Sequence, residues 1–364
     1  MGKRILILSN HFITLYNFRR ELIKRLNDEG HEVYISIPKS DDNIFFEDMG
    51  CMIIETSVDR RGINPLRDIG LIAKYIRIMK EVQPNIVFSY TIKPNIYGSI
   101  ASNITKSKHV NNITGTGGTF LKKNFVGETA KLLYKLSVKS SYKVFFQNSG
   151  DKDLFIKNKL VKDNYEMLPG SGVNLEQFNV RDFPSGEETN FIFMGRIMEL
   201  KGIDQYLDAA KIVKEEYPKA NFYIAGFIEE EKYKSIIYEY DSKSIISYIG
   251  FQKDVKSWIE KCHCTILPSH GGEGVPNVLL ESASMGRACI ASSINGSKDV
   301  IDDGVTGYLF ETGNVESLIE KVKQFINLSY EEKKVMGLSG HEKVAKEFNR
   351  ELVINRYLDE VEKA

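Results

Sequence analysis

The clearest chemical signal in this sequence is a glycine-rich turn bracketed by two carboxylates, Glu273 and Glu281. The turn follows the apolar segment Cys264–Leu267 and leads into a helix predicted over Val278–Met285. A helix that begins there directs unpaired N–H groups and the positive end of its dipole at whatever lies in front of it, which suits a phosphate. The carboxylates, one before the helix and one about two turns into it, suit sugar hydroxyls. The residues that follow Glu273 are Gly274, Val275, Pro276, Asn277 and Val278.

A second loop, earlier in the chain, carries two cations. A buried strand predicted over Phe191–Met194 is followed by Gly195, Arg196 and then Lys201. An Arg can grip a phosphate through two parallel hydrogen bonds, and a Lys acts as a mobile point charge. Each loop alone has an ordinary alternative: a strand–loop–helix turn with Glu281 in solvent, and a surface loop. Together they supply cations for a diphosphate and carboxylates for its sugars.

These two loops resemble the signatures of the retaining nucleotide-sugar glycosyltransferases called family 4, which have the GT-B fold. The Glu-x7-Glu spacing and the Gly-Arg-x4-Lys-Gly loop carry the resemblance, and it extends to Pro169–Asn174 and Asp303–Leu309. It runs from Arg4 to about Tyr357 and so covers nearly the whole chain.

The resemblance implies a role for each of these residues. Arg196 and Lys201 would stabilise the charge that grows on the departing diphosphate, helped by the amides from Val275 to Val278. Glu273 would hold hydroxyls of the donor sugar, and Glu281 would hold the ribose. The donor would be a UDP-sugar, with a UDP-N-acetylhexosamine favoured, and we expect neither a cofactor nor a metal ion.

Two segments of the N-terminal half narrow the resemblance to a subgroup. Tyr90–Asn95 and the Thr-Gly-Thr-Gly-Gly loop from Thr114 to Gly118 resemble enzymes that act on polyprenyl-diphosphate-linked sugars in bacterial polysaccharide and glycan assembly, such as N-acetylgalactosaminyltransferases. Thr114 stands where many family members have a His that faces the donor sugar, and a Thr cannot act as a base at neutral pH. The candidate cleft or acceptor contacts are Asn10, His11, Lys93, Thr114, Gly115 and Ser171.

The pattern of the chain predicts the elements that must position these residues. Strand-like and helix-like segments alternate in both halves, which predicts an α/β protein with two doubly wound Rossmann-like domains that face a cleft. Helices are predicted over Phe18–Asn27, Ile69–Val82 and Ala130–Lys139, and from near Asp204. Strands are predicted at Ile5–Leu8, Val33–Ile37, Met52–Glu55, Ile86–Ser89, His109–Asn112, Val144–Gln147, Glu166–Leu168, Phe191–Met194, Phe222–Ala225, Ile245–Ile249, Cys264–Leu267 and Ala288–Ala291.

We predict an N-terminal, acceptor-binding domain over residues 1–180 and a C-terminal, nucleotide-sugar-binding domain over 189–350. Residues 181–188 form the expected linker, because their pattern is the weakest. The resemblance implies that a final helix, 351–364, packs back on the N-terminal domain.

Composition and charge limit the remaining possibilities. The chain has 364 residues, 42% of them hydrophobic, and its four cysteines form no disulfide framework. Its only early apolar run, Ile5–Leu8, is too short for a signal peptide, so we expect a cytoplasmic protein. Residues 1–170 hold 26 Lys and Arg against 17 Asp and Glu, whereas the remainder holds 23 against 32. This basic N-terminal half predicts peripheral binding to the anionic inner face of the cell membrane, with a solvated lysine-rich surface as the alternative. Nucleic acid is disfavoured, because the acidic half would repel it.

Cations and aromatics of the N-terminal half are the candidates for that membrane contact: Phe12, Tyr16, Arg19, Arg20, Arg60, Arg61, Lys122, Lys123, Phe125, Lys131 and Lys135. A further motif, Asp151-Lys152-Asp153, resembles a metal-binding Asp-x-Asp pair. Because it opens a predicted helix after Asn148, capping explains it better.

The sequence therefore predicts a retaining, metal-independent glycosyltransferase that moves a sugar to a membrane lipid-diphosphate-linked saccharide in bacterial surface glycan synthesis. The alternatives are a sugar-nucleotide epimerase of similar fold and a non-catalytic sugar-nucleotide-binding partner.

Overall fold

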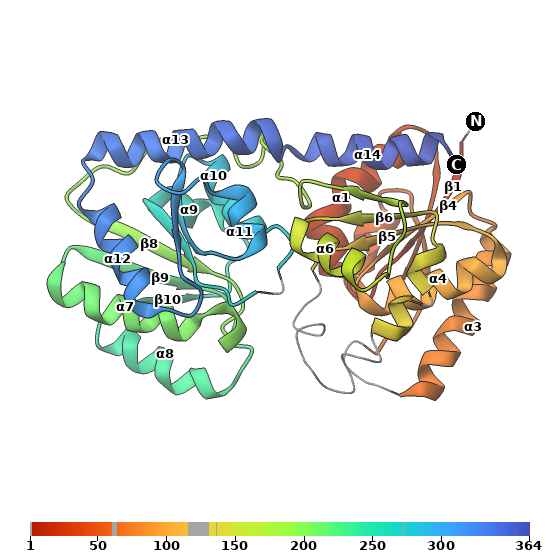
Figure 1. Cartoon of the computed structure of the whole chain (residues 1–364), viewed down its shortest axis with the longest axis horizontal. Coiled ribbons are helices and arrows are strands. Elements are labelled where there is room, and N and C mark those ends of the chain that lie inside the picture. The colour runs from red at the N-terminus through yellow and green to blue at the C-terminus, as the bar shows by residue number, and fades with distance from the viewer. Residues whose placement is uncertain (1, 60–63, 116–130, 136, 272) are drawn as a thin grey trace. The chain divides into compact units, whose positions relative to one another are not determined.

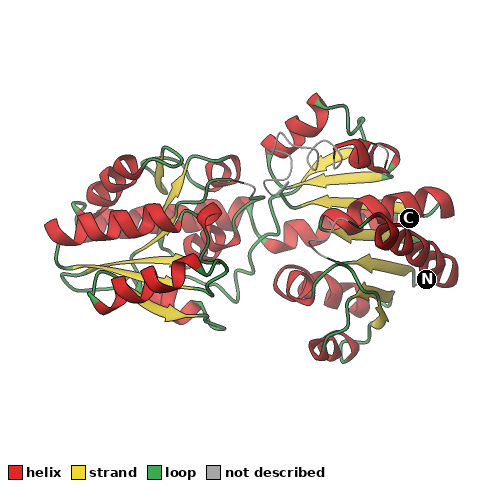
Figure 2. Ribbon diagram, turned by 90° about the horizontal axis from the view of Figure 1, so that it is seen from below, coloured by secondary structure: helices red, strands yellow, loops and turns green. Residues whose placement is uncertain are grey.

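The chain folds into two compact α/β units, and each is described by itself. The computed structural model describes residues 2–59, 64–115, 131–135, 137–271 and 273–364. The first unit comprises Met1–Ser171 and Glu351–Ala364, and the second comprises Gly172–Arg350. Each contains one parallel sheet with helices on both faces (Figures 1 and 2), so the predicted fold class is confirmed.

The first unit has a seven-stranded sheet in the order β3-β2-β1-β4-β5-β6-β7. Its strands are β1 (Arg4–Leu8), β2 (Glu32–Ile37), β3 (Met52–Glu55), β4 (Ile86–Tyr90), β5 (Lys108–Ile113), β6 (Lys143–Phe146) and β7 (Tyr165–Met167). Its helices are α1 (Phe12–Asp28), α2 (Ile44–Glu47), α3 (Pro65–Val82), α4 (Ile92–Thr105), α6 (Ser149–Lys157) and α14 (Arg350–Glu362).

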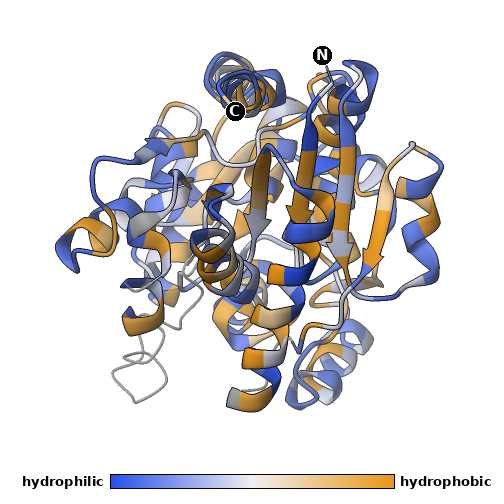
Figure 3. Ribbon diagram, turned by 90° about the vertical axis from the view of Figure 1, so that its right-hand side faces the viewer, coloured by the Kyte–Doolittle hydropathy of each residue, from blue (hydrophilic) through white to orange (hydrophobic). Residues whose placement is uncertain are grey.

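After Arg4, every residue of strand β1 is apolar, rather than every second one. Ile5 and Ile7 pack in the core on one face of the sheet, whereas Leu6 and Leu8 pack in the core on the other. A parallel sheet covered by helices on both faces has no solvated side, so every position of a central strand is buried. Figure 3 shows the result as hydrophobic strands beneath helices of mixed character.

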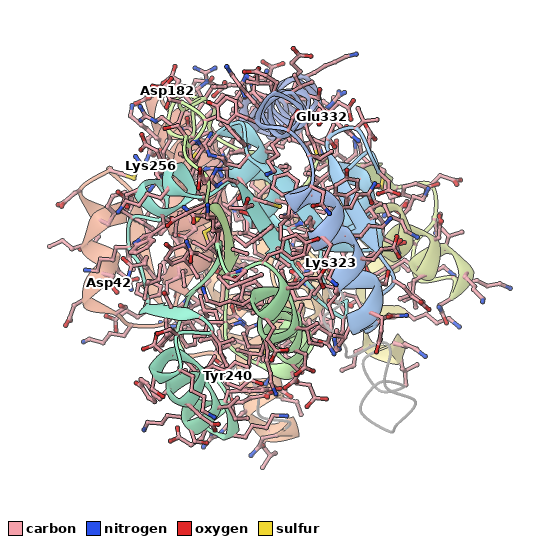
Figure 4. All side chains as sticks on the ribbon, turned by 90° about the vertical axis from the view of Figure 1, so that its left-hand side faces the viewer. Asp42, Asp182, Tyr240, Lys256, Lys323 and Glu332 are labelled. Carbon is pink, nitrogen blue, oxygen red and sulfur yellow. The ribbon has the colours of Figure 1, made fainter. Side chains whose placement is uncertain are left out.

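The second unit has a six-stranded sheet in the order β10-β9-β8-β11-β12-β13. Its strands are β8 (Thr189–Met194), β9 (Ala220–Ala225), β10 (Ser247–Gly250), β11 (Cys264–Leu267), β12 (Ala288–Ser292) and β13 (Gly307–Phe310). Its helices are α7 (Ile203–Glu216), α8 (Lys232–Ser242), α9 (Lys256–Lys261), α10 (Asn277–Ser284), α11 (Asn295–Val300), α12 (Val315–Ile326) and α13 (Tyr330–Glu347). Charged side chains such as Lys323 on α12 and Glu332 on α13 lie on its outside (Figure 4).

The boundary between the units differs from the sequence prediction. The first unit ends at Ser171 rather than at residue 180, and residues 181–188 lie within the second unit, where most of them are exposed but Phe183 is buried. Phe178 lies in the second unit's core, and the buried guanidinium of Arg287 donates to the carbonyl oxygens of Arg181 and Asp182 at 3.1 and 2.7 Å. These contacts fix a segment whose own sequence shows no periodic pattern.

Strand β13 is the strand that the sequence analysis missed. Its residues Gly307–Phe310 overlap the segment Asp303–Leu309, which the sequence analysis named only as part of the family resemblance. This position of the strand requires a glycine, because a Cβ on Gly307 would lie 2.1 Å from the carbonyl oxygen of Cys289. Among the helices that the structure describes, none is long and apolar enough to span a bilayer.

Candidate active site

Two loops of the second unit meet where the order of its strands reverses. Strand β8, the first of the unit, lies directly beside β11. Ligands of doubly wound sheets bind at the carboxyl ends of the strands at such a reversal, because the connections on either side diverge there. The loop after β8 carries Arg196 and Lys201, and the loop after β11 carries Glu273. The predicted cations and the first predicted carboxylate therefore share one edge of one sheet.

The two loops can approach closely because Gly202, where they meet, has no side chain. Lys201 ends the short 3-10 turn Glu199–Lys201, and Gly202 follows in the left-handed conformation with φ of +73°. A Cβ on Gly202 would lie only 1.9 Å from the carbonyl oxygen of Pro268. A residue with a side chain is excluded here by both backbone strain and contact, and this close approach brings Lys201 to the second loop.

Lys201 and Glu273 form an ion pair rather than two separate contacts for a ligand. Nζ of Lys201 binds Oε1 of Glu273, and the hydroxyl of Ser269 donates to the same oxygen at 3.0 Å. The two charged side chains are 20% and 18% exposed, so solvent screens them less than a surface pair. A diphosphate that reaches Lys201 must therefore share its ammonium group with Glu273.

Arg196 is held more loosely. Its side chain is 45% exposed, and Nη1 lies 3.8 Å from Oε1 of Glu229, which follows β9. An exposed ion pair of this length contributes little free energy. The guanidinium can therefore turn towards an arriving anion at small cost.

Glu281 is the fifth residue of α10, a little more than one turn into the helix rather than about two. Its side chain is half-buried, and desolvation raises the pKa of its carboxyl from 4.5 to about 7, while the charge of Arg350 opposes the shift. Arg350 itself is bound to the carbonyl oxygen of Gly172 through Nη2 at 3.0 Å. Glu281 therefore changes charge near neutral pH and is a credible acceptor for hydroxyl donors.

The remaining predicted donor contacts line the approach to α10. Gly274, Val275 and Pro276 are buried, and Asn277 and Val278, both half-buried, begin the helix. The first amides of a helix have no partner within it, so they are available to an anion. Gly195 leads from β8 into the cation loop.

A third loop, after β12, completes this edge and was missed by the sequence analysis. A Cβ on Gly296 would lie 1.8 Å from the carbonyl oxygen of Gly274, so the two loops touch through their backbones. The hydroxyl of Ser297 and Oδ1 of Asn277 are buried without a hydrogen-bond partner in the described structure. Buried polar atoms are rarely left unsatisfied, so both are available to a ligand. The signal in the sequence was the Asn-Gly-Ser triplet after a buried strand.

The candidate residues of the first unit lie at or near the carboxyl edge of its own sheet. His11 caps α1, since its Nδ1 accepts from the N–H of Ile13 at 3.1 Å. His11 therefore has a structural role as the cap of α1. Lys93, near the start of α4, forms an ion pair with Asp68 at 2.8 Å. Asn10 is half-buried beside the end of β1.

Three further candidates have mixed outcomes. Ser171 is buried and accepts from Nε2 of Gln147 at 3.4 Å, which ties it to the protein. Thr114 and Gly115 follow β5 and are half-buried, and Gly115 has φ of +121°. The rest of that glycine-rich loop, residues 116–118, lies outside the described residues.

The structure corrects part of the predicted membrane surface. Arg19 is 3% exposed, with its guanidinium 4.8 Å from the ring of Tyr90. Phe12 and Tyr16 stack on each other at 5.3 Å and pack on the aromatic side chains of α2. Arg19 is therefore wrong as a membrane contact, whereas Phe12 and Tyr16, both half-buried, stay predictions. The candidates outside the described residues are Arg60, Arg61, Lys122, Lys123 and Phe125.

The Asp-x-Asp segment opens a helix. Oδ1 of Asn148 accepts from the N–H of Asp151 at 2.8 Å, and its Nδ2 donates to Oδ2 of Asp151 at 2.8 Å. Capping thus occupies Asp151, while Asp153 is exposed beside Lys152. Within the described ranges, no group of three acidic, His or Cys side chains could hold a metal ion.

Comparison with known proteins gives two family matches. Residues 176–342 match the model of the group 1 glycosyl transferases, and residues 4–148 match the model described as glycosyl transferase 4-like. Similar proteins include the N,N'-diacetylbacillosaminyl-diphospho-undecaprenol alpha-1,3-N-acetylgalactosaminyltransferase of Campylobacter jejuni, 25% identical over 98% of this chain and 97% of that protein. The UDP-Gal:alpha-D-GlcNAc-diphosphoundecaprenol alpha-1,3-galactosyltransferase of Escherichia coli is 25% identical over 71% of this chain and 70% of its own length.

Solved structures share the fold over the full length of the chain. A glycosyltransferase from Rickettsia africae has a TM-score of 0.82 and 18% identity, covering 98% of this chain and 97% of that one. Anabaena HepE in complex with UDP and glucose has a TM-score of 0.81 and 16% identity, covering all of both chains. At this level of identity the likeness establishes the two-domain architecture.

Proposed function

The chain belongs to the glycosyl transferases, with a 4-like N-terminal domain and a group 1 C-terminal domain, and from this we propose that it transfers a sugar from a UDP-sugar to a lipid-diphosphate-linked saccharide. The observation that carries the proposal is the meeting of Arg196, Lys201 and Glu273 at one sheet edge. The Campylobacter jejuni and Escherichia coli relatives are named for diphospho-undecaprenol acceptors, and the former is similar over almost the whole chain. We favour a UDP-N-acetylhexosamine as donor.

Charge neutralisation at the leaving group is the main catalytic contribution that these residues offer. When the bond between the donor sugar and the diphosphate breaks, negative charge grows on the diphosphate. Arg196, Lys201 and the first amides of α10 lie at one edge of the sheet, where we place the diphosphate. Fixed positive charge next to a leaving group is usually the largest contribution to catalysis. The reaction then requires no metal ion and no cofactor.

Retention of the anomeric configuration is proposed through attack on the same face as the departing group. In that reaction the acceptor hydroxyl forms the new bond to the anomeric carbon, and the leaving phosphate takes the hydroxyl proton. Glu273 is a poor nucleophile because Lys201 and Ser269 both bind its Oε1. Its role in the proposal is to orient Lys201 and to accept hydroxyl groups of the donor sugar. Glu281 accepts from the ribose.

In this proposal the enzyme reaches its acceptor at the inner face of the cell membrane. The first unit is the basic half of the chain. Helix α3 (Figure 1) belongs to this unit, and its residues Leu66 and Ile69 are 81% and 62% exposed. Half-buried Lys131 and exposed Lys135 add described positive charge. Exposed aliphatic side chains beside cations suit shallow insertion into an anionic bilayer.

The decisive experiment incubates the protein with a panel of nucleotide sugars and short-chain polyprenyl-diphosphate saccharides, and identifies the products by mass spectrometry. The expected product is the acceptor plus one hexose-type residue, with UDP released in equal amount. Its anomeric configuration, read by NMR, tests retention. An epimerised sugar nucleotide without transfer would contradict the proposal, and so would binding of UDP-sugars without turnover on any acceptor.

A further inference from the structure

The first unit contains a pocket apart from the residues discussed for the donor. Its volume is about 620 Å³, which is within the usual range for a small-molecule site. The wall is formed by the segment after β3, the first turns of α3 and the start of α4. The last residue of β3 and the segment after it contribute Glu55, Thr56, Ser57 and Asp59. The pocket thus adjoins the carboxyl end of a parallel strand, where ligands of such sheets bind.

The charges that line this pocket balance. Its carboxylates are Glu55, Asp59 and Asp68, and its cations are Arg67, Lys74 and Lys93. Two oppositely charged pairs are formed within the wall. Lys93 lies 2.8 Å from Asp68 and Arg67 lies 3.6 Å from Asp59. Because the charges balance, the pocket offers no excess positive charge for a diphosphate.

The deepest of these pairs is held in place from more than one side. The side chains of Lys93 and Asp68 are 15% and 16% exposed. Burial and a hydrogen bond to Asp68 raise the pKa of Tyr97, so the phenol stays protonated and donates to that carboxylate. A carboxylate fixed by an ammonium group and a phenol keeps its orientation in the empty pocket. Such preorganisation reduces the cost of binding a neutral ligand.

A neutral saccharide is the class of ligand that these groups suit. Each sugar hydroxyl both donates and accepts, so it can donate to a carboxylate and accept from a cation or from a Ser or Thr hydroxyl. Helix α3 also exposes Leu66 and Ile69 close in sequence to the pocket residues Arg67, Asp68 and Gly70. Apolar surface next to an oxygen-rich pocket fits a saccharide that is attached to a lipid.

We propose that this pocket binds the saccharide of the lipid-linked acceptor and not its diphosphate. The proposal rests on the proposed function, since it assigns the part of the molecule that holds that acceptor. Lys93, a candidate acceptor contact from the sequence, is then a saccharide contact oriented by Asp68. The pocket's carboxylates and hydroxyls would select the acceptor saccharide.

Gly70 provides a clean way to fill the pocket. It lies within α3 and lines the wall, yet a Cβ built on it meets no atom within 4 Å. Gly70→Trp therefore introduces bulk without a backbone clash, and Gly70→Ala is the matched control, because Ala favours a helix more than Gly does. Lys80→Trp places the same side chain on an exposed position further along α3.

The experiment measures acceptor KM, kcat and UDP affinity for the four proteins. It also uses saturation-transfer NMR with the methyl glycoside of an N-acetylhexosamine as a direct probe of the saccharide. We expect G70W to raise the acceptor KM at least tenfold and to lose the glycoside contacts. K80W should behave as the wild type, G70A should raise the acceptor KM much less than G70W because a methyl group fills little of the pocket, and UDP affinity should stay unchanged in all four.

The outcomes separate this inference from the proposed function. Transfer by the wild type with an unchanged acceptor KM in G70W would overturn the pocket assignment and leave the function intact. If the wild type transfers no sugar, but glycoside contacts are seen in every protein except G70W, the pocket assignment is supported and the proposed function is overturned. Absence of glycoside contacts in the wild type, or their displacement by inorganic pyrophosphate, would overturn the saccharide assignment.

Discussion

Replacing Glu281 with Gln should stabilise the protein at alkaline pH. The carboxyl has a pKa of about 7 in the folded chain against an ordinary value of 4.5. The unfolded state therefore loses this proton first, and stability falls as the pH rises from 4.5 to 7 and is then constant. Each pKa unit corresponds to about 1.4 kcal/mol. Because a half-buried carboxylate retains some hydration, we expect a penalty of about 1–3 kcal/mol above pH 7.

Thermal unfolding of the wild type and of Glu281→Gln between pH 5 and pH 8 measures this penalty. A domain of this size gains about 2–4 °C in Tm per kcal/mol. The two proteins should unfold at similar temperatures at pH 5, and Glu281→Gln should gain several degrees by pH 8. Histidines titrate in both proteins, so the difference between the two profiles isolates Glu281.

Nucleotide binding supplies the second readout. If ionised Glu281 accepts from the ribose, the affinity of the wild type for UDP should increase between pH 6 and pH 8, whereas the affinity of Glu281→Gln should change less over this range. Isothermal titration at each pH measures both. A variant that is less stable than the wild type at pH 8, or that keeps the wild-type pH profile for UDP, would refute the reasoning about this carboxyl.

Three further predictions concern catalysis, metal and membrane. Arg196→Ala or Lys201→Ala should lower kcat by about 10²–10³, the usual loss for one charge-stabilising donor; a folded variant with wild-type turnover in the transfer assay would remove the diphosphate assignment. Transfer should survive EDTA, and a loss of activity that Mg²⁺ or Mn²⁺ restores would make the acidic residues of segment 151–153 candidate ligands again. Sedimentation with vesicles should increase with anionic lipid and decrease with salt, and Leu66→Asn with Ile69→Asn should weaken it while UDP binding is kept. Equal sedimentation with neutral and anionic vesicles at low salt would contradict the membrane proposal.

Most strands were predictable because a short, mainly apolar run lies between polar turns. The central strand Cys264–Leu267 and the edge strand Met52–Glu55 both have the predicted bounds. Gly307–Phe310 was missed because a glycine and a turn motif obscure its short apolar run, and its place in the sheet depends on contact with Cys289. A contact of that kind depends on residues far away in the sequence.

The site was predictable in its residue types but not in its pairing. The spacing within each loop indicated Arg196, Lys201 and Glu273, yet the ion pair between the last two depends on β8 and β11 being neighbours. Arg19 was misread for a similar reason. A cation on an amphipathic helix is usually solvated, and only the packing of α14 encloses this one between Tyr90 and Tyr357.

The return of α14 to the first unit has a consequence for how the chain acquires its structure on the ribosome. Tyr357 fills the space between Phe88 and Phe145, and Val353, Ile354 and Val361 belong to the same core. Residues 1–171 are synthesised first, but that core lacks these side chains until residues 351–364 have been translated. The domain that is synthesised first therefore cannot complete its core until the end of the chain has been made. A chain that stops before residue 351 leaves the apolar side chains that α14 covers exposed to chaperones.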